Sequence, residues 1–494
     1  MKNLFFLPLI CTALLLTVMD QALGQKRLLG KIDFPNSGSP DAQDDFIEGM
    51  LFLHNFEYED AARAFRRAQQ KDPDFALAYY GEAKTHNHPI WMQQDREAAI
   101  EVLKKLAETP GARMEKAKTQ REKDYLHTIE VLYGNTPETE NRSKEERDDL
   151  YMDAMSVLHE KYPEDHEATA FYGLSILGTA HEGRDFGIYM KAAAELFDIW
   201  YDNKKHPGAA HYLIHSFDDP IHAPLGLPMA RAYSEIAPDA AHAQHMTSHI
   251  FLALGMWDGV VSANIVARRV QTNRQRELNE KTTVCGHYPW WLQYGYLQRG
   301  DVKEAGKVLE TCHDRIKKTD SPDESYGESW HFAVMRGHQV IDSEEWEAHE
   351  KWTADIDPGS SPGRNYHFTT AFALVQSGEL ESAREALEQL RKVEKSEKLD
   401  IQVMQIESLL FIADGETDKG ITLLKKAVEK ESALPISFGP PTIVKPSHEL
   451  LGDTYLKLGK NRKALQAYEK QLERTPKRRR SLIGKRKAQG MASN

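Results

Sequence analysis

Two segments at opposite ends of the chain share one pattern of small residues, aromatic residues and a closing proline. The first consists of Gly49, Phe52, Ala61, Phe65, Ala68 and Pro73, and the second of Leu451, Gly452, Tyr455, Ala464, Tyr468 and Pro476. Small residues let two helices cross closely, aromatic rings fill the space between them, and proline ends the second helix. The pattern predicts antiparallel helix pairs, and no stretch alternates with the period of a strand.

Between these segments, turn signals recur at residues 254–258, 299–301, 377–379 and 414–416, each followed by a helical pattern. The two terminal segments closely resemble the tetratricopeptide repeat family. This resemblance implies an all-α fold, an α-solenoid of roughly eight or nine tetratricopeptide-like helix pairs. It also implies a concave groove in which ligands of the family usually bind.

The repeat pattern and its interruptions divide the chain into nine segments. They are a signal peptide (1–24), a flexible leader (25–40), N-terminal helix pairs (41–134), an exposed loop (135–147), histidine-rich helix pairs (148–275), C-terminal helix pairs (276–433), a proline-rich loop (434–446), a final repeat (447–476) and a basic, solvated tail (477–494).

The N-terminus predicts export. Lys2 precedes an apolar stretch at residues 4–18, and the small residues Ala22 and Gly24 suit a cleavage site. No later stretch reaches the length of a transmembrane helix, so we expect a periplasmic or cell-surface protein without a transmembrane segment in its mature chain. The mature chain keeps Cys285 and Cys312, which fall at the two ends of one predicted helix pair and could form a disulfide.

The charge of the chain argues against nucleic acid as a partner. The formal net charge is −12, and the basic residues do not form a concentrated surface apart from the C-terminal run. Binding to phosphates needs such a surface. We therefore expect a protein, peptide or glycan ligand.

Histidines recur in register with the predicted repeat. His211 and His215 are followed, each after 34 residues, by His245 and His249. Within each pair the spacing of four places both rings on one helical face, and Asp218 and His242 extend the two stripes. The sequence thus predicts that histidines from neighbouring helices face one shared surface, on the concave side of the solenoid.

Three interpretations of this surface follow. Neutral imidazole binds zinc, copper, nickel and iron, so His211, His215, His245 and His249 could converge on one divalent transition metal. The side chains of Asp218, Asp219 and His222 could complete its ligand shell. The rings could instead hydrogen-bond one another in a packed inner layer. Thirdly, the surface could bind an organic ligand, and Trp290 and Tyr294, one turn apart on a following helix, would then add an aromatic platform.

Several blocks resemble a particular group of secreted bacterial tetratricopeptide proteins with histidine-rich segments and no established activity. The blocks are Tyr80-Gly81-Glu82, residues 87–91 with His88, residues 206–212, residues 237–249 and residues 439–441. This resemblance covers nearly all of the mature chain. It implies that the histidines act together.

Catalytic motifs are absent from the sequence. It contains no His-Glu-x-x-His, no Gly-x-Ser-x-Gly and no phosphate-binding loop. We therefore expect binding rather than catalysis: an exported scaffold that captures its ligand in a concave groove centred on His211, His215, His242, His245 and His249. The alternative is a metal-binding protein or metal-dependent hydrolase that uses the same histidines.

Overall fold

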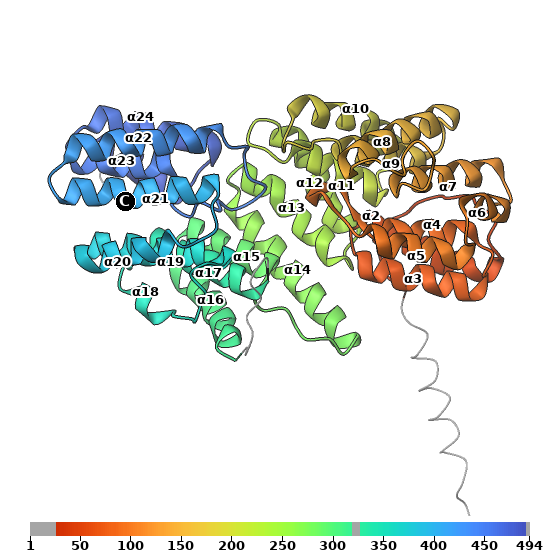
Figure 1. The fold of residues 1–494 in the computed structure, drawn as a ribbon, viewed down its shortest axis with the longest axis horizontal. Helices are drawn as coiled ribbons and strands as arrows, with labels where there is room; N and C mark the ends of the chain where they lie inside the picture. Colours follow the sequence, from red (N-terminus) through yellow and green to blue (C-terminus); the bar gives the residue numbers. More distant parts are fainter. Residues whose placement is uncertain (1–25, 319–326, 491–494) are drawn as a thin grey trace, which may run out of the picture.

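The structure is a computed structural model that describes residues 26–318 and 327–490. The predicted signal peptide at 1–24 lies outside the described residues. Within them the chain forms 24 α-helices, and each helix packs against its neighbour along the chain (Figure 1). The prediction of an all-α solenoid is confirmed. The 24 helices correspond to 12 pairs, which is more than the roughly eight or nine expected. Short helices carry no recognisable repeat pattern, so the sequence did not reveal them.

The helices of the first half, which is drawn in red to green in Figure 1, are α2 (Gln43–His54), α3 (Tyr58–Lys71), α4 (Ala76–Lys84), α5 (Arg96–Leu106), α6 (Pro110–Lys116), α7 (Gln120–Leu132), α8 (Lys144–Lys161), α9 (His166–Leu177), α10 (Phe186–Asp202), α11 (Pro207–Phe217), α12 (Ala223–Ile236), α13 (Ala241–Ala253) and α14 (Trp257–Glu277). A two-residue antiparallel ribbon, β1 (Asn87–His88) with β2 (Gln93–Gln94), interrupts the series.

The helices of the second half, drawn in green to blue, are α15 (His287–Arg299), α16 (Val302–Ile316), α17 (Glu328–Ser343), α18 (Ala348–Lys351), α19 (Ser361–Ser377), α20 (Leu380–Leu390), α21 (Glu397–Ala413), α22 (Thr417–Ala433), α23 (Ser447–Lys457), α24 (Asn461–Arg474) and α25 (Arg479–Ala488). Among the described residues, no helix is both long enough and apolar enough to span a membrane.

Close helix crossings occur where the sequence pattern places them. A Cβ atom added at Gly49 would lie 2.7 Å from the Phe65 ring, and one added at Gly452 would lie 2.7 Å from the Tyr468 ring. Such contacts are too short for any side chain, so glycine is needed at both positions for the aromatic ring of the second helix to pack. The repeat register proposed from the sequence is therefore correct at both ends.

The predicted disulfide is confirmed. Cys285 directly precedes α15 and Cys312 lies near the end of α16, and the two residues are bridged with a Cα–Cα distance of 4.8 Å. Antiparallel packing of α15 and α16 brings these two ends together, as the helix-pair pattern predicts. The bridge ties the first helix pair of the second half into one unit.

The first half of the solenoid closes on itself. Helix α2 packs against α11, although the two are far apart in sequence. The backbone carbonyl of His54, at the end of α2, accepts a hydrogen bond from His211 at 2.7 Å, across 157 residues. The inner face of these repeats is therefore filled by helices. The open concave groove expected from the resemblance is absent at this place, because α2 occupies it.

The segment expected to be a flexible leader is instead part of this closed core. Leu29 and Phe34 are buried, and the Lys31 amide donates to the carbonyl of Lys205. The Leu28 amide also bonds the Asp239 carboxylate. These two hydrogen bonds attach the start of the segment to the loops that precede α11 and α13, and the Phe34 ring packs on Phe46 of α2 and Tyr125 of α7.

The basic tail also differs from expectation. Arg478 is fully buried, and its guanidinium donates to Asp342 at 2.5 Å and to Glu449 at 2.9 Å. It also donates to the Tyr294 hydroxyl at 3.1 Å. Residues 479–488 form α25, which packs on α15, α23 and α24. The basic run was expected to be solvated because it is charged, but buried carboxylates from earlier repeats neutralise its key member.

Candidate metal centre

The histidines predicted to act together form two neighbouring groups of three. The first triad is His211 and His215 on α11 with His242 on α13. The second triad is His245 and His249 on α13 with His287 at the start of α15. Each of the two helical pairs spaced by four residues thus belongs to its own group. This differs from the single shared metal shell expected from the sequence, because α13 supplies both groups from successive turns.

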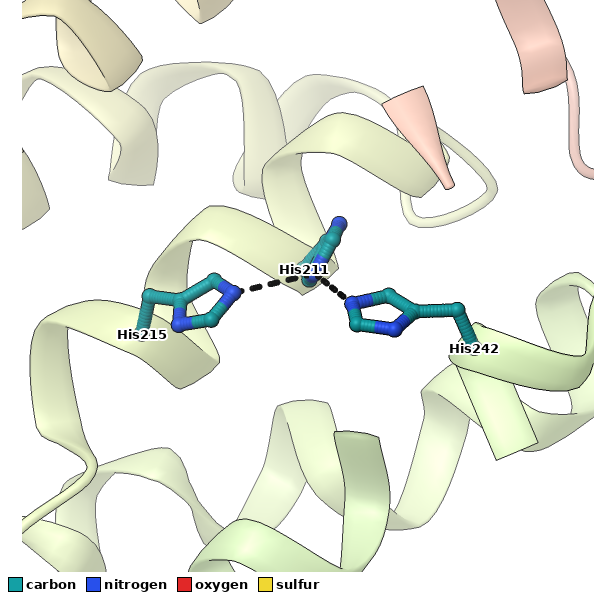
Figure 2. A group of neighbouring side chains, drawn as sticks. All are labelled: His211, His215 and His242. Carbon is teal, nitrogen blue, oxygen red and sulfur yellow. Dashed lines mark hydrogen bonds between the residues drawn. The ribbon is translucent and has the colours of Figure 1, made fainter. Parts of the chain in front are cut away.

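In the first triad, the Nε2 atoms point at one another (Figure 2). The Nε2 of His211 lies 3.1 Å from that of His215 and 3.2 Å from that of His242. On its other side the ring of His211 bonds a backbone carbonyl oxygen through Nδ1. A carbonyl only accepts, so Nδ1 carries the proton, and neutral His211 presents a lone pair at Nε2.

The second triad repeats this geometry. The Nε2 of His245 lies 3.1 Å from that of His249 and 2.9 Å from that of His287. The Nδ1 of His245 faces the Asn264 Oδ1 at 2.8 Å, and the amide of Asn264 is oriented by donation to the Val260 carbonyl. The Nδ1 of His245 is therefore the donor, which leaves its Nε2 lone pair directed at the other two rings.

Asp218 orients the remaining buried ring of the second triad. Its Oδ2 lies 2.5 Å from the Nδ1 of His249. A carboxylate behind a histidine fixes the ring and its tautomer and raises its basicity, which is the usual arrangement behind metal-bound histidines. The sequence placed Asp218 in the ligand set itself. In the structure it lies behind a histidine instead.

The chemistry of the six rings suits a transition metal. With metal–nitrogen bonds of about 2.0–2.1 Å, nitrogen ligands lie about 2.9 Å apart at right angles and about 3.3 Å apart in a tetrahedron. The Nε2 separations from His211 and His245 to the two other rings of their triads are 2.9–3.2 Å and match this range, and all three ligand atoms of each triad lie within 4.8 Å of one another. Three imidazoles also leave coordination positions for water or another ligand. The two triads adjoin, since the rings of His215 and His249 are 6.0 Å apart.

Burial keeps the central ring of each triad neutral. His211 and His245 are fully buried, and burial lowers the pKa of both imidazoles well below the ordinary value. Neighbouring histidines lower it further, His215 for His211 and His287 for His245. The neutral form is the one that binds metals. His287 is exposed to solvent at the edge of the second triad.

Phe56 covers the first triad and has an unfavourable backbone conformation. Its ring lies 4.3 Å from that of His211, and its φ of +54° is in the left-handed region. In other helix pairs the corresponding turn uses glycine, as at Gly255 and Gly459. A residue with a side chain pays about 1–2 kcal/mol for this conformation. The phenyl ring at this turn therefore serves the histidine cluster rather than the turn itself.

A third group, formed by His54, Glu167 and His206, lies next to the first triad. Glu167 accepts from His54 at 2.6 Å and from His206 at 3.1 Å, with all three side chains buried. Burial raises the pKa of the Glu167 carboxyl, but the two histidines more than offset this and hold it below its ordinary range. Both carboxylate oxygens have partners, so this group serves to hold His54, whose carbonyl orients His211.

The other residues proposed from the sequence lie outside the triads. Trp290 and Tyr294 are buried, with Trp290 packed on Trp330 and Tyr294 bonded to Arg478, so they do not form an open platform. His88 stacks on Tyr58 with ring centroids 4.0 Å apart. The adjacent Trp91 approaches His242 at 6.1 Å and is 45% exposed, which makes it an outer cover of the first triad.

Sequence reasoning did not assign His287, Asn264 or Phe56 to the site. His287 breaks the 34-residue interval, because the longer α14 precedes it. Asn264 lies on the second helix of its pair, where the repeat pattern predicts only packing residues. The available signal was Phe56, a large residue at a turn where several other repeats carry glycine, as at Gly255 and Gly459.

Comparison with known proteins supports the repeat assignment at one end of the chain. Residues 446–478 match the tetratricopeptide repeat family. The chain is thus an all-α repeat protein whose last unit is a tetratricopeptide repeat. No curated protein matches the chain.

Several solved structures are similar in outline. Yeast Tom70 has 10% identity and a TM-score of 0.34, over 91% of this chain and 95% of that one. The Cut9–Hcn1 hetero-tetramer of the APC/C has 11% identity and a TM-score of 0.36, over 97% and 82%. The P58(IPK) tetratricopeptide domain has 14% identity and a TM-score of 0.24, over 91% and 98%. At these values no property passes from these proteins to this chain.

Proposed function

We propose that this protein binds transition metal ions at two adjacent three-histidine centres. One observation carries the proposal: His245 and His249 both have Nδ1 tied to an oxygen acceptor, and their Nε2 atoms lie 3.1 Å apart in the protein interior. Two nitrogen lone pairs repel at this distance. A cation between them removes the repulsion, and the His287 ring supplies a third ligand.

The oxygen atoms that bond the outer nitrogens of these rings favour a metal over simple packing. A packed layer of histidines would leave each ring free to choose the tautomer that donates to its neighbour. Here an amide oxygen and a carboxylate set the tautomers of His245 and His249 so that their lone pairs converge, and a carbonyl directs the lone pair of His211 at the two other rings of its triad. Neutral imidazole and the absence of thiolate ligands suit zinc, copper, nickel or iron.

Metal content tests this proposal directly. Protein produced without an affinity tag, loaded with zinc or copper and dialysed, is expected to retain about two ions per chain, one for each triad. Inductively coupled plasma mass spectrometry, normalised to protein by amino-acid analysis, measures the ratio. A ratio far below one after loading with each of zinc, copper, nickel and iron would overturn the proposal.

Binding of a protein partner is the second candidate. A surface groove of about 540 Å³ between α14 and α16 favours it, because Arg268, Arg269, Arg276 and Lys307 line it on a chain that is acidic overall. Such a groove suits an acidic peptide segment. Fluorescence anisotropy with a labelled oligoglutamate peptide is expected to show saturable, salt-sensitive binding that Arg269→Glu weakens. An equal response to an oligolysine peptide would contradict this candidate.

We also propose that the protein is exported. The signal-like residues 1–24 and the Cys285–Cys312 disulfide support this location, since disulfides persist outside the reducing cytoplasm. Metal centres outside the cytoplasm would then load from the periplasm or the medium.

A further inference from the structure

Arg184 is a buried cation that lacks hydrogen bonds. Its side chain is 2% exposed, and none of Nε, Nη1 and Nη2 has a hydrogen-bond partner. The guanidinium lies against two aromatic rings, 5.0 Å from that of Tyr189 and 4.2 Å from that of Phe438. Burying a charged group without hydrogen bonds costs several kcal/mol, so such a group in a folded protein calls for a ligand.

The nearest carboxylate does not meet this need. Asp219 Oδ2 is 3.6 Å from Nη1 of Arg184, which is beyond hydrogen-bonding distance. Moreover, Asp219 already accepts from the backbone amides of Ile221 and His222 and from the His222 ring. Arg184 therefore has five N–H donors and a positive charge available in one plane.

Arg184 lies beside the histidine triads. Its nearest carboxylate, Asp219, directly follows Asp218 in the chain, and Asp218 bonds the ring of His249 in the second triad. The Nδ1 of His215 is also buried without a hydrogen-bond partner. Asp218 and Asp219 both line a cavity of about 70 Å³ under the proline-rich loop, and so do Ser437 and Gly439, the two neighbours of Phe438 in the chain. Arg184 adjoins this cavity through Asp219 and does not itself line it. That volume has room for a few atoms beyond a single water.

We propose that Arg184 binds the carboxylate of a small organic monoanion at the edge of the two histidine triads. A guanidinium matches a carboxylate through two parallel hydrogen bonds, which would satisfy the orphaned nitrogens. Asp218 and Asp219 stand close by, so a dianion such as phosphate or sulfate meets more repulsion than a monoanion. The rings of Tyr189 and Phe438 provide an apolar wall for the organic part of the ligand.

This inference deepens the proposed function, because it places an organic ligand where the three-histidine centres keep open coordination positions. The recognition of the carboxylate by Arg184 does not itself require the metal. The two ideas can therefore fail separately, and the experiment keeps them apart.

Thermal unfolding of the wild-type protein and of Arg184→Met tests the inference. The probes are formate, acetate and benzoate at constant ionic strength, with sulfate for comparison, each added to apo and zinc-loaded protein. Monocarboxylates are expected to raise the Tm of the wild type by roughly 1–3 °C at saturation, and sulfate less. Arg184→Met is expected to show no rise. Arg184→Lys keeps the charge without the planar fork and should respond weakly, and Arg231→Met, on an exposed residue of α12, should respond like the wild type.

A second readout separates binding from structure. Without ligand, Arg184→Met is expected to melt at or above the wild-type temperature, because a buried, unsatisfied guanidinium has been removed. A variant that melts several degrees lower, or one whose carboxylate response equals that of the wild type, would overturn the inference. So would a wild type that responds to none of the three carboxylates. If carboxylates raise the Tm of the wild type but not of Arg184→Met while neither protein retains zinc, Arg184 binds the anion and the metal proposal fails. If both proteins retain two ions and their Tm values respond equally to carboxylates, the metal proposal stands and the Arg184 inference fails.

Discussion

His211→Ala and His245→Ala are each expected to lower the metal content from about two ions per chain to about one, and the double variant to remove both. Each of these rings lies at the centre of its triad, in contact with both other Nε2 atoms. Loss of a group that only hydrogen-bonds a metal ligand weakens metal binding about 10–100-fold. Loss of one of three direct ligands weakens it more. Elemental analysis and competition with a chromophoric chelator measure the effect.

His88→Ala is the matched control, since His88 lies in neither triad, and it should retain both ions. Circular dichroism of all variants checks that the helices persist. A single metal shell, as the sequence suggested, would make the losses caused by His211→Ala and His245→Ala strongly non-additive. The structure predicts nearly additive losses instead. If His211→Ala alone removes both ions, the six histidines form one cooperative centre and the division into two triads is wrong.

Arg478→Met is expected to reduce the free energy of unfolding by about 3–5 kcal/mol, the usual cost of removing one partner from a buried ion pair. Methionine keeps much of the volume, so the loss reports the charge. Without Arg478, the carboxylates of Asp342 and Glu449 remain buried close together. Burial raises the pKa of Glu449, but Arg478 and Lys445 bring it down to about 2. That stabilising contribution, present above the ordinary pKa of the carboxyl, disappears with the arginine.

Urea unfolding followed by circular dichroism measures this change as a lower midpoint with a similar slope. Arg486→Met provides the control, because Arg486 lies exposed on the same helix α25 and should change stability by less than about 0.5 kcal/mol. Equal midpoints for the two variants would show that the C-terminal helix does not depend on the buried ion pair and would restore the view of a solvated tail.

The sequence was sufficient for the helix pairs and for placing His211 beside His215 and His245 beside His249. Gly49 and Phe65 are neighbours within one repeat, and His211 and His215 share one helical turn, so local spacing determines both relations. The partition into two triads depends on His287, which a longer helix moves out of the repeat interval. The spacing of the histidines in the sequence does not reveal which neighbouring helix brings its side chains into contact with each ring.

Contacts between distant repeats were beyond sequence reasoning for a physical reason. The His54 carbonyl behind His211 is a backbone group, which no residue type announces. Arg478 was expected in solvent because charged residues are rarely buried unless they are paired. Its partners come from α17 and α23, and Arg184 likewise shows its unusual environment only once Phe438 packs over it.

Closure of the first half on itself changes how the protein can be made and how it can vary. In an open repeat array each unit contacts only its neighbours, so units can be gained or lost and folding can start in any unit and spread to the next. Here the contact between α2 and α11 forms only after the chain has grown by the 157 residues that separate His54 from His211. At about 5–20 residues per second, synthesis of that stretch takes about 8–30 s. During this time the apolar face of α2 needs protection from aggregation. Deleting any unit in between would part the His54 carbonyl from His211, so the chemistry of the site fixes the number of repeats.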